Sequence, residues 1–112
     1  MSFIRRTLMF TPISLTILLA LSVSAQAADF TIVNGQVETN SQTLNDNEMG
    51  AIEVGGQLNT ANNTAIIANG INTIVNNAGN ISTTGNGAFA IFSDGDNVSI
   101  TNSGSISTTG DG

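Results

Sequence analysis

The stretch "NTIVNNAGNISTTGNG" at residues 72–87 returns at residues 97–112 as "NVSITNSGSISTTGDG". The two copies are identical at nine of sixteen positions when they are aligned with a shift of 25 residues. A weaker copy, "GQLNTANNTA" at 56–65, aligns with "GNISTTGNGA" at 79–88 with a shift of 23. Repeats of this length are typical of solenoids, in which equivalent positions of successive turns stack on one another.

Each repeat is expected to contain three short strands. In the last unit they cover 88–92, 97–101 and 105–109, which are rich in apolar and β-branched residues and are separated by Asn, Asp, Ser and Gly. A fainter echo, "GQV" at 35–37 against "GQL" at 56–58, has a shift of 21, so the spacing varies as it does when insertions fall in turns. The pattern predicts an all-β fold, a parallel β-helix (β-solenoid) of about three coils with roughly 25 residues per coil. The alternative is a disordered Asn- and Gly-rich chain, which the recurring aliphatic positions disfavour.

The repeat also predicts which side chains stack. The expected pairs are Ile81 with Ile106, Val75 with Ile100, and Asn77 with Asn102, the last as an amide ladder. The repeated glycines, Gly79 with Gly104 and Gly85 with Gly110, are expected at corners that need a positive φ. Within "AFAIF" at 88–92, the alternation separates the alanines from Phe89 and Ile91 but leaves open which face points inward.

The N-terminus has the pattern of a secretory signal peptide. Arg5 and Arg6 precede an apolar run over 8–23, and the small residues "AQA" follow at 25–27. We expect cleavage after Ala27. A retained membrane anchor is the alternative, and it is disfavoured because the run is short for a span and contains a proline.

Cleavage divides the chain into a signal peptide, 1–27, and the start of an incomplete array of β-helix repeats, 28–112. Both basic residues of the sequence leave with the signal peptide, whereas all eight acidic residues remain. A surface without cations cannot neutralise phosphates, which argues against nucleic-acid binding and against adhesion to anionic lipid. The chain also has no Cys and no His. We therefore expect no enzyme and assign no catalytic, cofactor-binding or metal-binding residue.

Two close carboxylate pairs are the remaining candidates for chemistry. Asp94 and Asp96 flank Gly95, and Asp46 precedes Glu48 by two residues. The first pair could share a calcium ion, although an exposed turn explains it equally well in residue type and is favoured. Rows of Thr and Asn are the other candidate, because a flat uncharged row can bind sugars, ice or another protein, or can simply face solvent in a structural spacer.

The segment 77–112, "NAGNISTTGNGAFAIFSDGDNVSITNSGSISTTGDG", resembles the passenger repeats of Gram-negative autotransporters, the type V secreted proteins. Those repeats follow N-x-G-x-I-x-T-x-G-x-x-A-x-x-I, which matches Asn77, Gly79, Ile81, Thr83, Gly85, Ala88 and Ile91. The segment 30–60 is similar to the irregular first coil that follows the leader in such proteins. The resemblance implies an exported β-helix passenger and a C-terminal β-barrel in the outer membrane. No barrel-like series of strands occurs in this sequence, so we expect an N-terminal fragment or a truncated gene product.

The resemblance implies a structural or adhesive region at the cell surface or outside the cell, or in the periplasm if the gene is truncated. Its ligand on a host or neighbouring cell is unknown, and its only contact with a membrane would be the missing barrel. Self-association through an open end of the β-helix is expected. The alternatives are a fragment of a secreted β-helix enzyme that acts on polysaccharide, and a calcium-binding β-solenoid.

Overall fold

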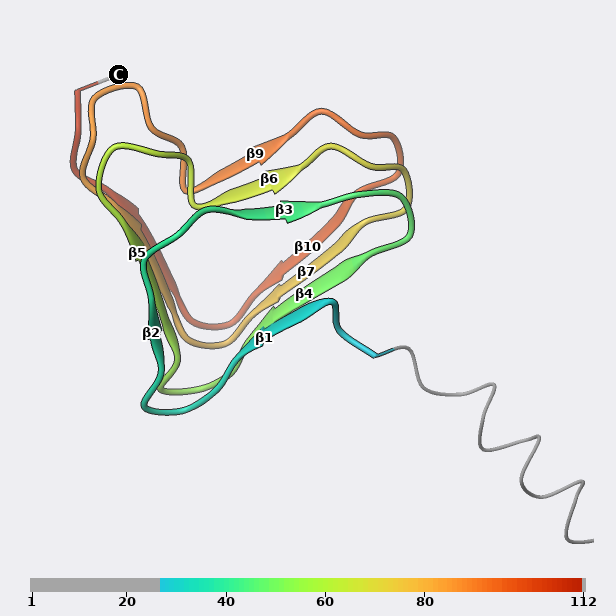
Figure 1. The fold of residues 1–112 in the computed structure, drawn as a ribbon, viewed down its shortest axis with the longest axis horizontal. Helices are drawn as coiled ribbons and strands as arrows, with labels where there is room; N and C mark the ends of the chain where they lie inside the picture. Colours follow the sequence, from blue (N-terminus) through green and yellow to red (C-terminus); the bar gives the residue numbers. More distant parts are fainter. Residues whose placement is uncertain (1–26, 112) are drawn as a thin grey trace, which may run out of the picture.

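The computed structural model describes residues 27–111, where the chain forms eleven short strands and no helix (Figure 1). The strands are β1 (Phe30–Ile32), β2 (Val37–Glu38), β3 (Gln42–Leu44), β4 (Met49–Ile52), β5 (Gln57–Thr60), β6 (Ile66–Ala68), β7 (Ile74–Asn77), β8 (Asn80–Thr83), β9 (Ile91–Ser93), β10 (Ser99–Asn102) and β11 (Ser105–Thr108). The expected signal peptide falls almost entirely on residues 1–26, outside the described residues. Within 27–111 there is no helix long and apolar enough to cross a membrane.

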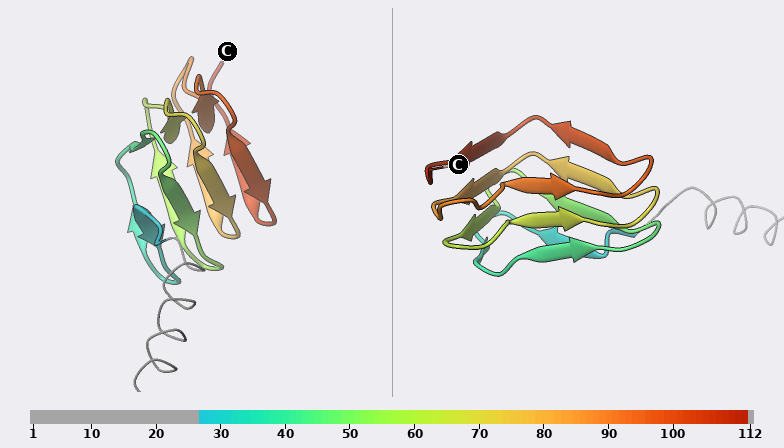
Figure 2. Two further views of the ribbon diagram at one scale, coloured as in Figure 1. Left: turned by 90° about the vertical axis from the view of Figure 1, so that its right-hand side faces the viewer. Right: turned by 90° about the horizontal axis from the view of Figure 1, so that it is seen from above.

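The strands form three parallel sheets, and the chain visits them in turn. Sheet A has the order β1-β4-β7-β10, sheet B the order β2-β5-β8-β11, and sheet C the order β3-β6-β9. We call β1–β3 the first circuit, β4–β6 the second, β7–β9 the third, and β10 with β11 the top layer. Figure 2 shows these circuits stacked along one axis. The expectation of an all-β chain with parallel pairing between repeats is confirmed.

Between the third circuit and the top layer the register is the one that the repeat predicts. Ile106 pairs with Ile81, Ile100 with Val75, and Asn102 with Asn77, all at a shift of 25. The weaker copy is also confirmed, because Gln57 pairs with Asn80 at the expected shift of 23. Identical or similar side chains therefore lie on one another because each residue repeats in the layer above.

The first circuit is displaced from its predicted register by one residue. Val37 pairs with Gln57 and Glu38 with Leu58, a shift of 20 where the sequence echo predicted 21. The turn before β2 sets this register, because Gly35 and Gly55 both have a positive φ and the Gly35 amide donates to the Gly55 carbonyl at 3.0 Å. A slip of one residue exchanges the faces of a strand. Val37 is therefore 54% exposed, and Glu38 occupies the inward position.

The core is a narrow column of aliphatic side chains between the three sheets. Its buried members are Ile32, Leu44, Ile52, Leu58, Ala65, Ile66, Val75, Ile81 and Ala90. Each sheet sends alternate residues inward, as β5 does with Leu58 and β8 with Ile81. The Phe30 ring lies where a side chain on Gly50 would project, so the glycine makes room for the only aromatic residue packed against this core.

The predicted role of the repeated glycines is wrong. Among residues 27–111 the glycines with positive φ are Gly35, Gly55 and Gly87. Those expected at such corners, Gly79, Gly85, Gly104 and Gly110, have ordinary backbone angles and are needed for close approach instead. A Cβ on Gly79 would overlap the carbonyl oxygen of Gly56, and one on Gly104 would overlap that of Gly79. Stacked corners come so close that only the absence of a side chain allows the layers to meet.

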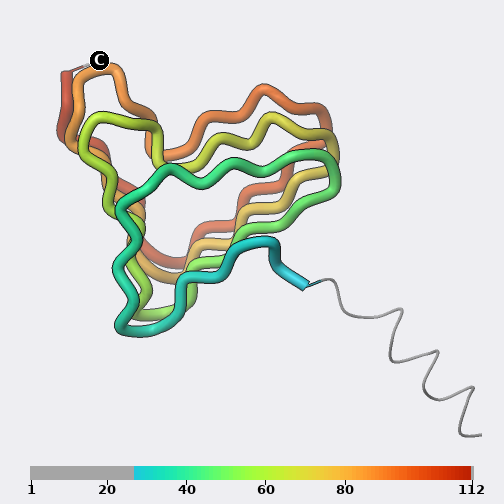
Figure 3. The backbone as a smooth tube through the Cα atoms, in the orientation of Figure 1, coloured from blue at the N-terminus to red at the C-terminus, as the bar shows by residue number. Residues whose placement is uncertain are grey.

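The structure settles which side of "AFAIF" faces inward. β9 begins at Ile91, three residues later than predicted, because the residues before it belong to the loop from sheet B to sheet C. Ala90 is buried and Ile91 packs against the core, while Phe89 and Phe92 are exposed. Figure 3 shows that the loops between β5 and β6 and between β8 and β9 extend beyond the shorter connection of the first circuit.

Candidate functional site

An asparagine ladder runs up the corner between sheets C and A. Asn47, Asn72 and Asn97 all have a positive φ, of 62°, 56° and 59°. The Asn72 Nδ2 donates to Asn47 Oδ1 at 3.1 Å, and the Asn97 Nδ2 donates to Asn72 Oδ1 at 2.6 Å. Asparagine tolerates this left-handed conformation better than most residues. The sequence analysis missed this ladder, although asparagine at three positions exactly one shift of 25 apart was the available signal.

The predicted amide ladder at the corner between sheets A and B is confirmed. Asn77 is buried, and its Nδ2 donates to Asn102 Oδ1 at 2.8 Å and to the Ser105 carbonyl at 3.1 Å. Its Oδ1 accepts the Gly79 amide at 3.2 Å. One side chain thus satisfies the turn of its own circuit and binds the layer above, which makes this corner a structural element and not a free binding site.

The outward side of sheet B carries a row of uncharged polar side chains. The Asn59 Nδ2 donates to Gln57 Oε1 at 3.0 Å, and the Asn59 Oδ1 accepts from Asn80 Nδ2 at 3.3 Å and from Ser82 Oγ at 3.4 Å. These bonds hold the amides and hydroxyls in fixed positions before any ligand arrives. A neutral row of this kind can exchange hydrogen bonds with a sugar or with a polar protein surface.

Two aromatic rings stand on the outside of sheet C. Phe89 and Phe92 are 56% and 40% exposed, and their ring centroids lie 5.8 Å apart with an interplanar angle of 43°. Neighbouring Ile67, the register partner of Phe92, is half-buried on the same side. This small apolar patch is the surface feature that most resembles a contact point for another molecule.

The carboxylate pairs do not assemble a site. Asp94 and Asp96 remain in an exposed turn, and within residues 27–111 no group of three or more His, Cys, Asp and Glu side chains gathers. The second pair has local partners. Asp46 Oδ1 accepts the Ile71 amide at 3.0 Å, and Glu48 Oε2 accepts the Asn45 amide at 2.7 Å.

Glu38 is the acidic residue whose setting differs most from its usual one. Its Oε1 accepts the backbone amide of Asn40 at 3.0 Å, the Asn40 Nδ2 at 3.0 Å and the amide of Thr39 at 3.1 Å. The hydrogen bond from the Asn40 amide, followed by the other two, lowers the pKa of Glu38. The residue lies in the column of Leu58 and Ile81 but faces away from them at its lower end, so it closes the column with a solvated charge.

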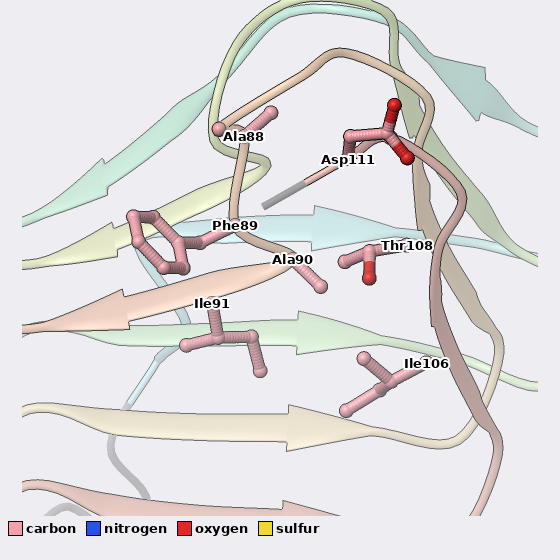
Figure 4. Close-up of a pocket in the computed structure, with 9 residues that line it drawn as sticks. Ala88, Phe89, Ala90, Ile91, Ile106, Thr108 and Asp111 are labelled. Atoms are coloured by element: carbon pink, nitrogen blue, oxygen red, sulfur yellow. The ribbon is translucent and has the colours of Figure 1, made fainter.

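The other end of the column is hollow. A depression of about 460 Å³ lies above the third circuit between β9 and β11, lined by Ala90, Ile91, Ile106 and Thr108 among others. Figure 4 shows Ile91, Ile106 and Thr108 directed into this space from opposite sides. Ile106 is 38% exposed and Ile100 is 46% exposed there. The inward columns therefore end in water at the top layer and not in a polar residue.

Comparison of the chain with protein-family models, with curated protein sequences and with solved structures found no match.

Proposed function

We propose that this chain is the exported start of an autotransporter passenger, a structural or adhesive region with no catalysis of its own. The proposal includes a leader over 1–27 that is cleaved after export and a β-helix of about three coils over 28–112. The observation that supports it best is the stacking of three parallel sheets at a constant shift of 25 residues in the last two layers. A chain built in this way extends outward by repetition, as a stalk on a cell surface requires.

The surface chemistry agrees with contact through neutral groups. Sheet B offers fixed amides and hydroxyls, and sheet C offers the Phe89–Phe92 pair. No cation is present after Arg6. The proposed partner is therefore an uncharged or polar surface on a host or neighbouring cell and not a nucleic acid. Contact with a membrane belongs to a β-barrel outside this sequence, and the location is the outer surface or the medium.

A surface-exposure experiment tests this proposal. The gene, with the genomic sequence that follows it, is expressed in a Gram-negative host with an epitope inserted after Val54, which is 74% exposed in a turn. We expect antibody to label intact cells and external protease to remove the label. The matched control lacks residues 1–27 and should keep the epitope inside the cell. An epitope that becomes accessible only after the outer membrane is opened would contradict surface display.

Adhesion is tested with the same cells. Replacement of Phe89 and Phe92 by serine removes the apolar patch and leaves the inward columns intact, because both rings point outward. We expect binding of the cells to a host-cell layer or to one another to fall while surface labelling stays constant. Unchanged binding would leave the stalk as the proposed role and exclude the aromatic pair as the contact.

A further inference from the structure

We propose that the first circuit is an end cap that rejects any coil placed beneath it, and that the top layer accepts a coil of another polypeptide with the same repeat chemistry. The inference concerns the two end faces of the stack and does not depend on the proposed function. Among residues 27–111, the edges of β9, β10 and β11 that point away from β6, β7 and β8 pair with no strand. A row of unpaired backbone groups on three sheets is a template for further strands.

The first sign of a cap is a charge in an apolar column. The inward column of sheet B reads Glu38, Leu58, Ile81 and Ile106 from the bottom upward. If the first circuit of one molecule were laid on the top layer of another, the Glu38 carboxylate would be buried on Ile106. Burial of an unpaired carboxylate is strongly unfavourable. The first circuit can therefore be a bottom layer only.

The second sign is the loss of the corner glycines. The corner between sheets A and B has Gly56, Gly79 and Gly104 in successive layers, but the first circuit has Gln36 there, one residue before the pair Val37 and Gln57. Because a Cβ on Gly104 would overlap the Gly79 carbonyl, the Cβ of a residue such as Gln36 would overlap the Gly104 carbonyl if it were placed above it.

The corner between sheets C and A repeats this pattern. Gly95 lies on Gly70, where a Cβ would overlap the Gly70 carbonyl, and Gly70 lies on Asn45 and Asp46. The first circuit therefore again has side chains where a layer that rests on another has glycine. Both corners and the sheet B column fail in the same circuit, and each failure alone prevents that circuit from resting on another.

The top layer has the opposite character. It has glycine at three corners, Gly95, Gly104 and Gly110, and its inward columns end in half-exposed isoleucine. The shift to the layer below is 25 in all three sheets, whereas between the first two circuits it is 20 in sheets A and B and 24 in sheet C. The face is thus regular where a partner would continue it, and the three ladders already present define the direction and spacing of that partner.

These features specify the partner. It is a polypeptide coil of about one repeat with parallel strands, apolar residues above Ile100 and Ile106, and glycine above Gly104. Three acidic residues, Asp94, Asp96 and Asp111, flank the face, so the partner is neutral or basic at those corners. The same charges disfavour two copies that meet through their top layers, and the cap disfavours copies stacked head to tail. The partner is therefore a different chain, and self-association is not the use of this face.

The test converts the cap into a defined probe. A donor variant carries Gln36→Gly, Glu38→Leu and Asn45→Gly, which remove the features that reject stacking, together with Ile106→Asp, which blocks its own top layer. Wild-type chain, purified from cells that express the full sequence, is the acceptor. At moderate salt, which screens the exposed acids, we expect the mixture to sediment as a one-to-one complex and each component alone to sediment as a monomer.

The control acceptor is the Ile106→Asp single variant, which should form no complex with the donor. Complex formation with this control, or a wild-type chain that is already dimeric or fibrous, would overturn the proposal, and so would the absence of a complex with a folded donor. If the donor does not fold, a covalent test replaces it, in which residues 88–112 are duplicated after Gly112. The added coil should raise the melting temperature and protect the amides of β9–β11 from hydrogen exchange. The same extension with alanine at its corner glycines should not, and equal gains from both extensions would overturn the proposal.

Discussion

Replacement of Ile81 by alanine should destabilise the fold far more than the same change at Ile106, although the two residues occupy equivalent positions of the repeat. Ile81 is 0% exposed between Leu58 and Ile106, whereas Ile106 is 38% exposed because no layer covers it in the described chain. The comparison isolates stacking, since residue type, strand position and column are the same in both.

The magnitude follows from burial. Removal of three buried carbons from Ile81 forfeits about 2.4 kcal/mol of transfer free energy. The cavity left between two fixed layers raises the loss to about 3–4 kcal/mol. At Ile106 the partial exposure reduces the transfer loss to about 1.5 kcal/mol, and no cavity forms because water already reaches the site. The difference of about 2 kcal/mol corresponds to roughly 8–16 °C in melting temperature for a domain of this size.

The assay is urea denaturation of the two variants and the wild type, followed by far-UV circular dichroism. We expect the free energy of unfolding to order as wild type, then Ile106→Ala, then Ile81→Ala. Equal losses at the two sites, or a larger loss at Ile106, would refute the argument that a covering layer encloses Ile81.

Three further substitutions test the corners and the cap. Gly79→Ala should cost about 1–3 kcal/mol through overlap with neighbouring carbonyls, and more than Gly87→Ala, whose φ of 71° strains alanine but whose surroundings are open; thermal melts that show the reverse order would restore the dihedral explanation for the repeated glycines. Asn72→Ala should lower the melting temperature more than Asn72→Gly, because both lose the amide ladder but only alanine is strained by about 1 kcal/mol at a positive φ; equal melting temperatures would show that the backbone there is not left-handed. Since the pKa of Glu38 is lowered from its ordinary value of 4.5, its contribution is complete above that value and is lost as the pH falls through the folded-state pKa, so Glu38→Gln should destabilise the chain at neutral pH and leave its melting temperature unchanged in strong acid. A variant that loses equal stability at both pH values would indicate a role for Glu38 that does not involve charge.

The sequence predicted the register wherever two layers have nearly the same composition. Ile81 with Ile106 and Asn77 with Asn102 follow directly, because a residue that must pack on its own equivalent is retained as that residue. The same reasoning failed in the first circuit, where three matching letters suggested a shift of 21. There the stacked turn of Gly35 and Gly55 decides the register, and no side-chain similarity reports on turn geometry.

Two features of the corners lay beyond pattern reading for different reasons. Glycine is compatible both with a positive φ and with close approach, so the letter alone could not distinguish them at Gly79 and Gly104. Asparagine was assigned a ladder at Asn77 and Asn102, but the left-handed ladder at Asn47, Asn72 and Asn97 begins in a layer whose surrounding sequence has diverged. The candidate surfaces depend on which side of each strand faces out, and in "AFAIF" the alternation alone did not settle that.

The central claim, that layers stack in parallel at a shift of 25 residues, is tested most directly with engineered cysteines, since the chain has none of its own. Asn76 and Thr101 are register partners with exposed side chains on the outer side of sheet A. Their Cα atoms should lie about 4.8 Å apart, within the range that a disulfide bridges. The account predicts that Asn76→Cys with Thr101→Cys forms an intramolecular disulfide under mild oxidation, and that Asn76→Cys with Ser99→Cys, about 8 Å apart on the same face, does not. A disulfide in the second pair and none in the first would contradict the register on which the stack depends.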